Sequence, residues 1–180
     1  MNPVSLAVIL FLQTLLIIGI LFMIHWHVVA LTSVPWVRTP RWKTRRMFEL
    51  AGLKTGERVV DFGSGDGSTV IDAARDFGAK GQGIEMQRLL FWLSRARART
   101  LGLSGRVKFV RGDIFGEPMP DADVIFSYLF PKVNARLEPI LRNRYPSGTR
   151  VVSRTFSFPT LPLVASEKIG AETIYLYRIP

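Results

Sequence analysis

The sequence predicts an α/β protein in which a doubly wound, mostly parallel sheet is preceded by one N-terminal transmembrane helix. Three observations support this prediction. Residues 4–24 form an uncharged apolar run, and short β-branched runs alternate with helical stretches from residue 58 onward. The glycine-rich turn "VVDFGSGDGS" (59–68) follows the first of those runs. Such alternation is typical of strands buried beneath helices, with ligands bound beyond the carboxyl ends of the strands.

The apolar N-terminus is long enough to cross a bilayer. Residues 4–24 contain no Lys, Arg, Asp, Glu or Pro, and a helix of that length spans roughly 30 Å, the thickness of the hydrocarbon core. A cleaved secretory signal is the alternative, but no Lys or Arg precedes Val4 and no small-residue cleavage site follows Ile24. We therefore expect three parts: a retained single-pass anchor at 1–31, a linker at 32–40 and a globular domain at 41–180.

Positive charge next to this run sets the expected orientation. The first 37 residues carry no charged side chain, and Arg38, Arg41, Lys43, Arg45 and Arg46 then follow. Lys and Arg beside a span stay on the cytoplasmic side, so we expect the domain to lie in the cytoplasm. The lack of an Arg-rich transit segment favours a prokaryotic plasma membrane over a mitochondrial inner membrane. Anionic lipid explains the formal net charge of +10 without a nucleic-acid partner, which we do not expect.

Each element of the domain has its own signature. An amphipathic helix begins at residue 41 and ends near Gly52, and the apolar run 58–62 is the first buried strand. Glycines that follow helical stretches mark helix ends. The further helices expected are 68–78, 87–102 and 132–145, the last interrupted by Pro139, and the further strands expected are 81–85, 107–111, 122–127, 149–156 and 173–179.

Missing residue types exclude several kinds of chemistry. The chain has no cysteine, and its two histidines, His25 and His27, lie beside the apolar run. The domain therefore has no thiolate nucleophile, no Ser–His–Asp triad and no His-ligated metal. We expect no metal.

The turn after the first strand favours a cationic ligand. Gly63, Gly65 and Gly67 can adopt positive φ and let a ligand approach the backbone. The dinucleotide fingerprint G-x-G-x-x-G is not met, because Ser68 stands where its third glycine belongs, and no P-loop is present. Asp61 and Asp66 flank the turn, and carboxylates repel phosphates at close range, so these acids argue for a ligand without phosphates. An ordinary glycine-rich turn remains the alternative.

The acids around this turn resemble those of a known cofactor site. The pattern Asp61-x-Gly63-x-Gly65-x-Gly67 is similar to the loop of Rossmann-like (class I) methyltransferases, which bind S-adenosylmethionine. The resemblance implies that Glu85, after the second strand, binds the ribose hydroxyls and that Asp113, after the third, contacts the adenine amino group. The cofactor-binding residues implied are Asp61, Gly63, Ser64, Gly65, Asp66, Gly67, Glu85, Met86, Asp113 and Ile114.

Longer segments resemble one branch of that class. "GIEMQRLLFWLSRAR" (83–97), "VPWVRTP" (34–40) and "RVVSRTFSFP" (150–159) are similar to small membrane-anchored lysine methyltransferases of the ATP synthase c subunit and the adenine nucleotide translocase. Ser68-Thr69 departs from the Arg-Ile expected after "GSGDG". "SYLFP" (127–131) lacks the Asn/Asp-Pro-Pro-aromatic motif of nucleic-acid amino methyltransferases, which argues against a nucleic-acid substrate.

The resemblance implies methylation of a lysine on a membrane or membrane-proximal protein. Because no histidine base is available, we expect positioning and desolvation to supply the neutral amine. Tyr128 is the candidate catalytic residue that orients this amine, although a packed aromatic residue is an equal interpretation. The arginine face of 87–102 is interpreted as solvated, with contact to anionic lipid as the alternative. A lipid or quinone acceptor and a non-catalytic cofactor-binding protein are the other functions considered.

Overall fold

The computed structural model describes residues 2–32, 36–116 and 119–180 and divides into two compact units. The first unit, Met1–Trp36, contains helix α1 (Pro3–Thr32), and the second is Val37–Pro180. Within α1, Ser5–Ile24 has a mean hydropathy of 2.8 and is long and apolar enough to cross a membrane. The boundary between the units follows Trp36, whereas the linker was expected to extend to residue 40. Residues 33–35 of that linker lie outside the described residues.

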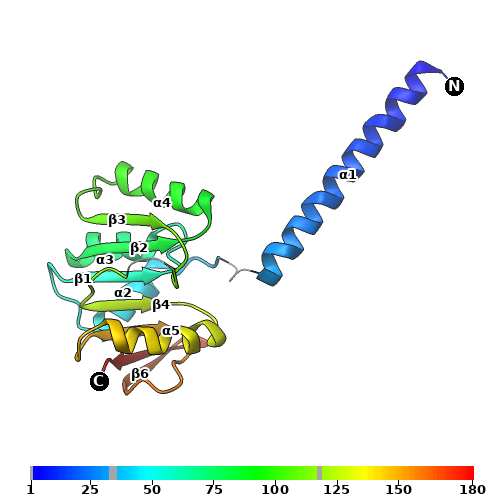
Figure 1. Ribbon diagram of the computed structural model, residues 1–180. Helices are drawn as coiled ribbons and strands as arrows, with labels where there is room; N and C mark the ends of the chain where they lie inside the picture. Colours follow the sequence, from blue (N-terminus) through cyan, green and yellow to red (C-terminus); the bar gives the residue numbers. More distant parts are fainter. Residues whose placement is uncertain (1, 33–35, 117–118) are drawn as a thin grey trace. The chain divides into compact units, whose positions relative to one another are not determined.

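The second unit is built on one seven-stranded sheet (Figure 1). Its strand order is β3-β2-β1-β4-β5-β7-β6. The first five strands run parallel, and β7 lies antiparallel between β5 and β6. The strands are β1 (Arg58–Phe62), β2 (Lys80–Glu85), β3 (Val107–Arg111), β4 (Val124–Ser127), β5 (Arg150–Arg154), β6 (Leu163–Ile169) and β7 (Glu172–Arg178).

Helices cover both faces of the sheet. On one face lie α2 (Arg41–Leu50), α3 (Ser68–Phe77) and α4 (Arg88–Thr100), and on the other lies α5 (Pro131–Arg144). Adjacent strand residues show the division, because Val59 packs with α2 and α3 whereas Val60 packs with α5. Successive side chains of β1 thus point to opposite faces of the sheet, and both faces are buried.

Helix α2 joins the body through its apolar stripe. Met47 and Phe48 are fully buried, and the Phe48 ring packs edge-on against Phe77 of α3. Burying such a side chain stabilises a fold by about 1.5–3 kcal/mol. The exposed side of α2 carries arginines, so the amphipathic helix expected at this position is confirmed.

The α/β fold class is confirmed, and two details of the expectation were wrong. The expected sheet lacked β6, whose side chains are mostly exposed because it is the outer strand of a hairpin. Helix α5 continues through Pro139 instead of being interrupted there. Proline removes one backbone N–H from the helix ladder, and both Pro139 and Ala135, one turn before it, are exposed. The carbonyl that Pro139 leaves unbonded therefore lies on the solvent side of α5.

Candidate active site

The glycine-rich turn lies where β1 ends and α3 begins. Gly63, Gly65 and Gly67 have φ values of 78°, 55° and 75°, as a turn this tight requires. The N–H groups of Gly63 and Ser64 both donate to the Ile84 carbonyl of β2, at 2.9 and 3.0 Å. The turn is thereby fixed against the neighbouring strand at the carboxyl edge of the sheet, which is where open α/β sheets bind ligands.

Gly67 is required by packing as well as by its backbone conformation. A Cβ atom at this position would lie 2.5 Å from Cζ of Phe109 and 2.8 Å from Cβ of Ser94. The absence of a side chain at Gly67 therefore allows the turn to pack against β3 and α4.

Glu85 ends β2 and binds the turn directly. Its Oε2 accepts a hydrogen bond from Gly65 N–H at 2.8 Å, and its Oε1 accepts one from Gln87 N–H at 2.7 Å. The residue is 6% exposed. The carboxylate thus connects the first strand's turn with the loop that begins α4, and this is the position at which the resemblance places the ribose.

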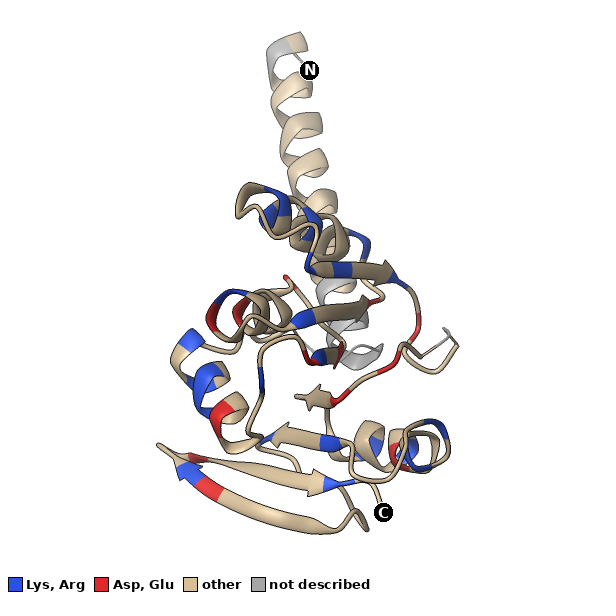
Figure 2. Cartoon of the chain, turned by 90° about the vertical axis from the view of Figure 1, so that its left-hand side faces the viewer, with Lys and Arg blue, Asp and Glu red and all other residues tan. Residues whose placement is uncertain are grey.

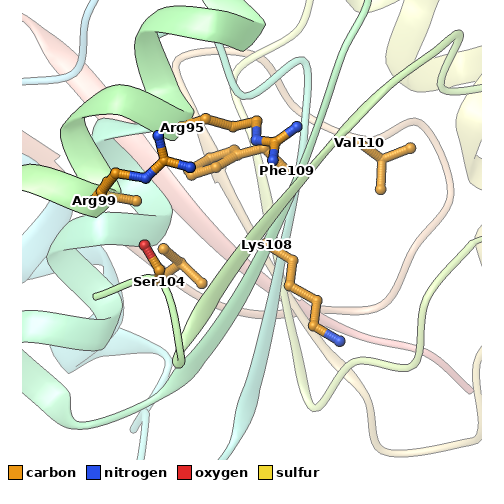
Figure 3. A pocket seen from close by; sticks show the side chains of 8 residues that line it. Arg95, Arg99, Ser104, Lys108, Phe109 and Val110 are labelled. Carbon is orange, nitrogen blue, oxygen red and sulfur yellow. The ribbon is translucent and has the colours of Figure 1, made fainter. Parts of the chain in front are cut away.

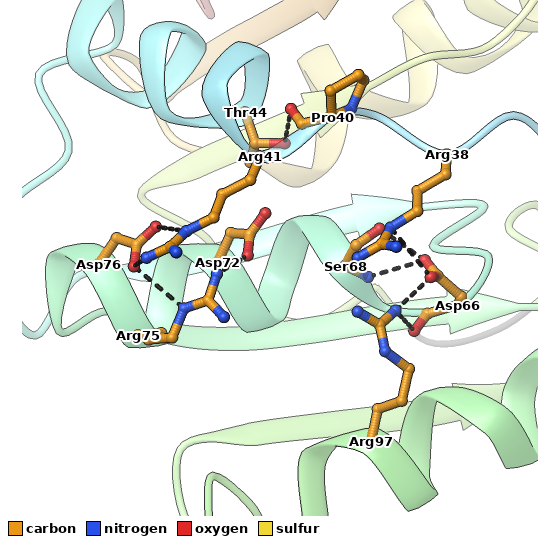
Figure 4. A network of polar contacts seen from close by, with 10 residues as sticks. All are labelled: Arg38, Pro40, Arg41, Thr44, Asp66, Ser68, Asp72, Arg75, Asp76 and Arg97. Carbon is orange, nitrogen blue, oxygen red and sulfur yellow. Dashed lines mark hydrogen bonds and ion pairs between the residues drawn. The ribbon is translucent and has the colours of Figure 1, made fainter. Parts of the chain in front are cut away.

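Asp66 already forms ion pairs within the protein (Figure 4). Its carboxylate accepts hydrogen bonds from the backbone N–H and hydroxyl of Ser68, the first residue of α3, at 3.1 and 2.6 Å. It also pairs with Arg97 of α4 and, at 3.5 Å, with Arg38. Asp66 therefore contributes less to a negative field at the ligand than the sequence indicated, and it organises the turn instead.

Asp61 is a buried acid whose pKa is strongly shifted by its surroundings. The pKa of Asp61 is raised to about 8, mainly by burial, with the hydrogen bond of the Thr69 hydroxyl lowering it and the charges of Glu85 and Asp66 raising it. An approaching cation would favour the ionised form. The carboxyl environment therefore suits a ligand that carries positive charge.

One buried hydroxyl in the same turn has no partner. Ser64 is 5% exposed, and its Oγ makes no hydrogen bond. Unpartnered buried hydroxyls are costly, and this Oγ lies against β2, where a Cβ added at Gly83 would be 2.4 Å from it. The buried carboxyl groups of Asp61 and Glu85 in this part of the structure fit the polar, cationic end of S-adenosylmethionine.

The remaining expected cofactor residues lie along the same edge of the sheet. Met86, 63% exposed, follows Glu85 before α4. Asp113 lies two residues beyond β3 and accepts a hydrogen bond from Phe115 N–H at 3.0 Å. Ile114 is half-buried against the core cluster on the α5 face. The turns after three consecutive, hydrogen-bonded strands thus come together as expected.

Tyr128 follows β4 and lies in an aromatic cluster. Its ring stacks on Phe156, with centroids 6.2 Å apart, and Phe130 meets Phe156 edge-on at 5.6 Å. Phe156 is half-buried, and Phe130 is 41% exposed. The rings form an accessible apolar wall at the end of β4 and β5. Phe158, by contrast, is buried in the core.

Arg154 is a site residue that the sequence analysis missed. Its guanidinium lies 4.1 Å from the Tyr128 ring centroid, and the side chain is 5% exposed. Glu172 binds it through two hydrogen bonds of 2.6 and 2.8 Å, and Thr39 Oγ1 accepts a third at 3.2 Å. These bonds lower the pKa of Glu172 to about 2, and Lys43 contributes to the same effect. Arg154 therefore fixes the plane of Tyr128.

Thr155 has the least favourable backbone conformation at this edge. Its φ is 65°, which no other described non-glycine residue shares in sign, and its buried Oγ1 makes no hydrogen bond. A β-branched residue at positive φ is strained, and such strain concentrates at functional sites. In the sequence, Thr155 lies in "RTFSF" (154–158), part of a segment that resembles the lysine methyltransferases. No role was predicted for this residue.

This fold and edge define a class I methyltransferase. The turn after β1, the acid that ends β2 and the acid after β3 lie at the carboxyl ends of three neighbouring strands, and an aromatic wall lies beyond β4 and β5. Among the described residues, no group of three histidines, cysteines or acids is placed to hold a metal ion.

Comparison with known proteins gives the family. A model of the ANTKMT methyltransferase domain matches residues 61–165. A protein-lysine N-methyltransferase of Saccharolobus islandicus is 34% identical over 151 residues, which are 81% of this chain and 94% of that protein. The adenine nucleotide translocase lysine N-methyltransferase of Mus musculus is 32% identical over 148 residues, which are 82% of this chain and 64% of the mouse enzyme.

A solved structure of a methyltransferase has a similar fold and sequence. The RNA methyltransferase from Salinibacter ruber, in complex with S-adenosyl-L-homocysteine, is 38% identical with a TM-score of 0.78, over 80% of this chain and 94% of that one. The chain thus belongs to the ANTKMT methyltransferase family. It is an S-adenosylmethionine-dependent methyltransferase, and its relatives include protein-lysine N-methyltransferases.

Proposed function

We propose that this enzyme N-methylates a lysine of a membrane or membrane-proximal protein. In this proposal α1 anchors the chain in the bilayer and the body lies on the cytoplasmic side, most simply at a prokaryotic plasma membrane. The apolar helix Ser5–Ile24 supports the anchor. The named substrate of the mouse relative, a translocase, supports a membrane protein as acceptor.

The main support for the proposal comes from the residues at the ends of β4 and β5, where the acceptor would bind. Tyr128, Phe130 and Phe156 form an apolar wall, and the charged group packed against it is Arg154, a cation that cannot serve as a base. The free pKa of lysine is about 10.4, and an apolar surface disfavours the charged ammonium. The rings also accommodate the aliphatic stem of lysine. An amine that loses its proton by desolvation therefore suits this edge.

The chain's own residues divide the work between two sides of the site. On the cofactor side, Asp61, Ser64 and Glu85 would hold the amino, carboxyl and ribose groups, with Met86, Asp113 and Ile114 beside the adenine. S-adenosylmethionine supplies the methyl group when bound. On the acceptor side, Tyr128 would orient the amine by its hydroxyl, and the aromatic wall would exclude water.

Transfer of label from tritiated cofactor to native membranes tests the proposal. The full-length enzyme should label a protein band, acid hydrolysis should release methyl-lysine, and Tyr128→Phe should label more slowly. Glu138→Gln is a control, because Glu138 is a buried carboxylate that binds Thr160 N–H away from the site. Label found only in RNA would overturn the acceptor assignment.

The same assay separates the competing acceptors. Label confined to the lipid extract would assign a lipid or quinone acceptor instead. No transfer to any fraction, with adenosylhomocysteine still bound tightly, would favour a cofactor-binding protein without catalysis.

A further inference from the structure

The positive charge of the body is distributed unevenly. Residues 86–112 contain seven basic side chains and no acid. Arg97 pairs with Asp66, but the other six have no ion pair anywhere in the part of the chain that the structure describes. Figure 2 shows blue segments along α4 and β3 at the upper end of the sheet. The six are Arg88, Arg95, Arg99, Arg106, Lys108 and Arg111.

The basic cluster next to α1 behaves in the opposite way. Every one of its five cations pairs with an acid of the body, so little of that charge remains free for a phosphate. The pairs are Arg38 with Asp66, Arg41 with Asp76, Lys43 with Glu172, Arg45 with Glu49, and Arg46 with Glu49 and Glu167. Unpaired positive charge is therefore concentrated on α4 and β3, whereas the other unpaired cations are dispersed along the chain.

Large apolar side chains lie among the free cations. On α4, Leu89, Trp92 and Leu93 are 80%, 54% and 42% exposed. The Arg95 guanidinium lies 5.3 Å from the Trp92 ring centroid. These residues lie at i, i+3 and i+4 on the outer side of the helix, opposite its buried side of Leu90, Phe91, Ser94 and Ala98. A helix exposing large apolar groups beside cations matches an interfacial helix.

A cavity of about 340 Å³ lies where this helix meets the edge strand β3. Arg95, Arg99, Ser104 and Lys108 line it, together with the Phe109 ring. In Figure 3, Arg95 and Arg99 extend from α4 beside Phe109, whereas Lys108 points away from them. The cavity offers cations and a hydroxyl next to apolar surface, and these groups complement a lipid headgroup that bears a phosphate.

We propose that the α4 face, defined as Leu89, Trp92, Leu93, Arg95, Arg99 and Lys108, docks on the surface of an anionic bilayer. The cations attract the headgroups, and the apolar side chains enter the boundary between headgroups and acyl chains. Exposed leucines favour a bilayer over RNA, whose recognition relies on cations and aromatic stacking. The unpaired positive charge argues against a second copy, because facing cations repel. This inference does not depend on which acceptor is methylated.

Site-specific fluorescence on the full-length protein tests the docking. Because the chain has no cysteine, Leu89→Cys gives a single labelling site for an environment-sensitive dye, and Ser166→Cys gives a control site on exposed β6. The proteins are reconstituted in nanodiscs of phosphatidylcholine, with or without phosphatidylglycerol. Quenching of the position-89 dye by nitroxide lipids should rise at least about twofold with the anionic lipid and fall with added salt. The position-166 dye should not respond.

Charge reversal gives a matched comparison. Arg95→Glu, Arg99→Glu and Lys108→Glu, combined, should abolish the extra quenching and leave adenosylhomocysteine binding intact. Lys54→Glu, Lys168→Glu and Arg178→Glu make the same change in net charge at exposed positions elsewhere and should preserve it. The salt titration needs no substitution and covers the case in which the first triple variant does not fold.

Three results would overturn the inference. Quenching could be equal in the two nanodiscs. A spectral shift that depends on protein concentration without anionic lipid would assign the face to a second copy. Stronger shielding of the dye by an RNA oligonucleotide than by phosphatidylglycerol would assign it to nucleic acid.

Discussion

The cofactor side and the acceptor side of the site are built differently. After β1 and β2 the geometry is set mainly by hydrogen bonds of the backbone. The N–H groups of Gly63 and Ser64 donate to the Ile84 carbonyl, and Glu85 binds the N–H of Gly65. After β4 and β5 the geometry comes from side chains, with Arg154 held beneath Tyr128 by Glu172 and Thr39. A turn made by backbone suits a cofactor shared by a whole class of enzymes. A wall made by side chains suits an acceptor that differs between relatives.

This difference predicts that substitutions on one side leave the other side's parameters unchanged. Variants of the cofactor side should change affinity for adenosylhomocysteine and the stability of the turn. Variants of the acceptor side should change turnover of the protein substrate at constant cofactor affinity.

Gly67→Ala should have the largest effect. The new Cβ would overlap Phe109 and Ser94 at a positive φ, which adds overpacking of about 1–3 kcal/mol to strain of about 1–2 kcal/mol. Chemical denaturation should show a loss of about 3 kcal/mol in the free energy of unfolding, with cofactor binding abolished. Gly56→Ala is the matched control, because Gly56 has φ 84° but a Cβ added there would have no atom within 4 Å. Equal losses in the two variants would contradict the packing argument.

Glu85→Gln should weaken cofactor binding by about 10–100-fold, because a charged acceptor to two backbone N–H groups becomes neutral. Titration calorimetry with adenosylhomocysteine measures the affinity, and the KM for the acceptor protein should stay the same. Glu138→Gln should lower stability without changing the affinity. A changed acceptor KM in Glu85→Gln would show that the two sides are coupled.

Arg154→Lys should lower kcat/KM for the acceptor about tenfold, because lysine cannot reproduce the planar contact with Tyr128 or the paired bonds to Glu172. The dissociation constant of adenosylhomocysteine should not change. Arg150→Lys is the matched control at the opposite end of β5, where Arg150 binds Glu57 at 2.6 Å and two backbone carbonyls. It should reduce stability and leave acceptor kinetics unaltered.

Asp61 should make the stability of the ligand-free enzyme depend on pH. Its folded pKa of about 8 lies above the ordinary 3.8, so the native state binds the proton more tightly than the unfolded chain does. Stability is then highest below the ordinary value and falls as pH rises toward 8. Asp61→Asn should flatten this decline in a series of thermal unfolding curves. Arg58 lowers the pKa of Asp123, so the stability that the ionised Asp123 contributes is lost as pH falls. Asp123→Asn should therefore flatten the loss of stability at low pH.

The sequence predicted the cofactor side better than the acceptor side for a physical reason. Glycines at forced turns and acids at strand ends are local signals, and Asp61, Glu85 and Asp113 lie at the strand ends as expected. Arg154 reaches Tyr128, Glu172 and Thr39 across separations that no local pattern encodes. The exposed edge strand β6 lacks the apolar alternation that identifies a half-buried strand, so the hairpin it forms with β7 was missed.

Charge was the other property that local sequence patterns misjudged. Asp66 was counted toward a negative field, yet its carboxylate pairs with Arg38 and Arg97. A count of charged residues along the chain does not show which of them pair after folding, because the partners come from distant elements. The ligand preference therefore depends on Asp61 and Glu85, both buried and close enough for the Glu85 charge to raise the Asp61 pKa.

Thr155 should give the smallest effect and separates strain from chemistry on the acceptor side. Thr155→Gly removes both the unfavourable φ and the hydroxyl, so the free energy of unfolding should rise by about 1 kcal/mol while acceptor turnover falls. Thr155→Ala keeps positive φ but lacks the hydroxyl, so turnover should fall by a similar factor without the gain in stability. Thermal unfolding and steady-state methylation of the same preparations measure both. If both variants keep full turnover, the unpartnered Oγ1 has no part in binding the acceptor, and the strain at Thr155 serves only to turn the chain toward Phe156.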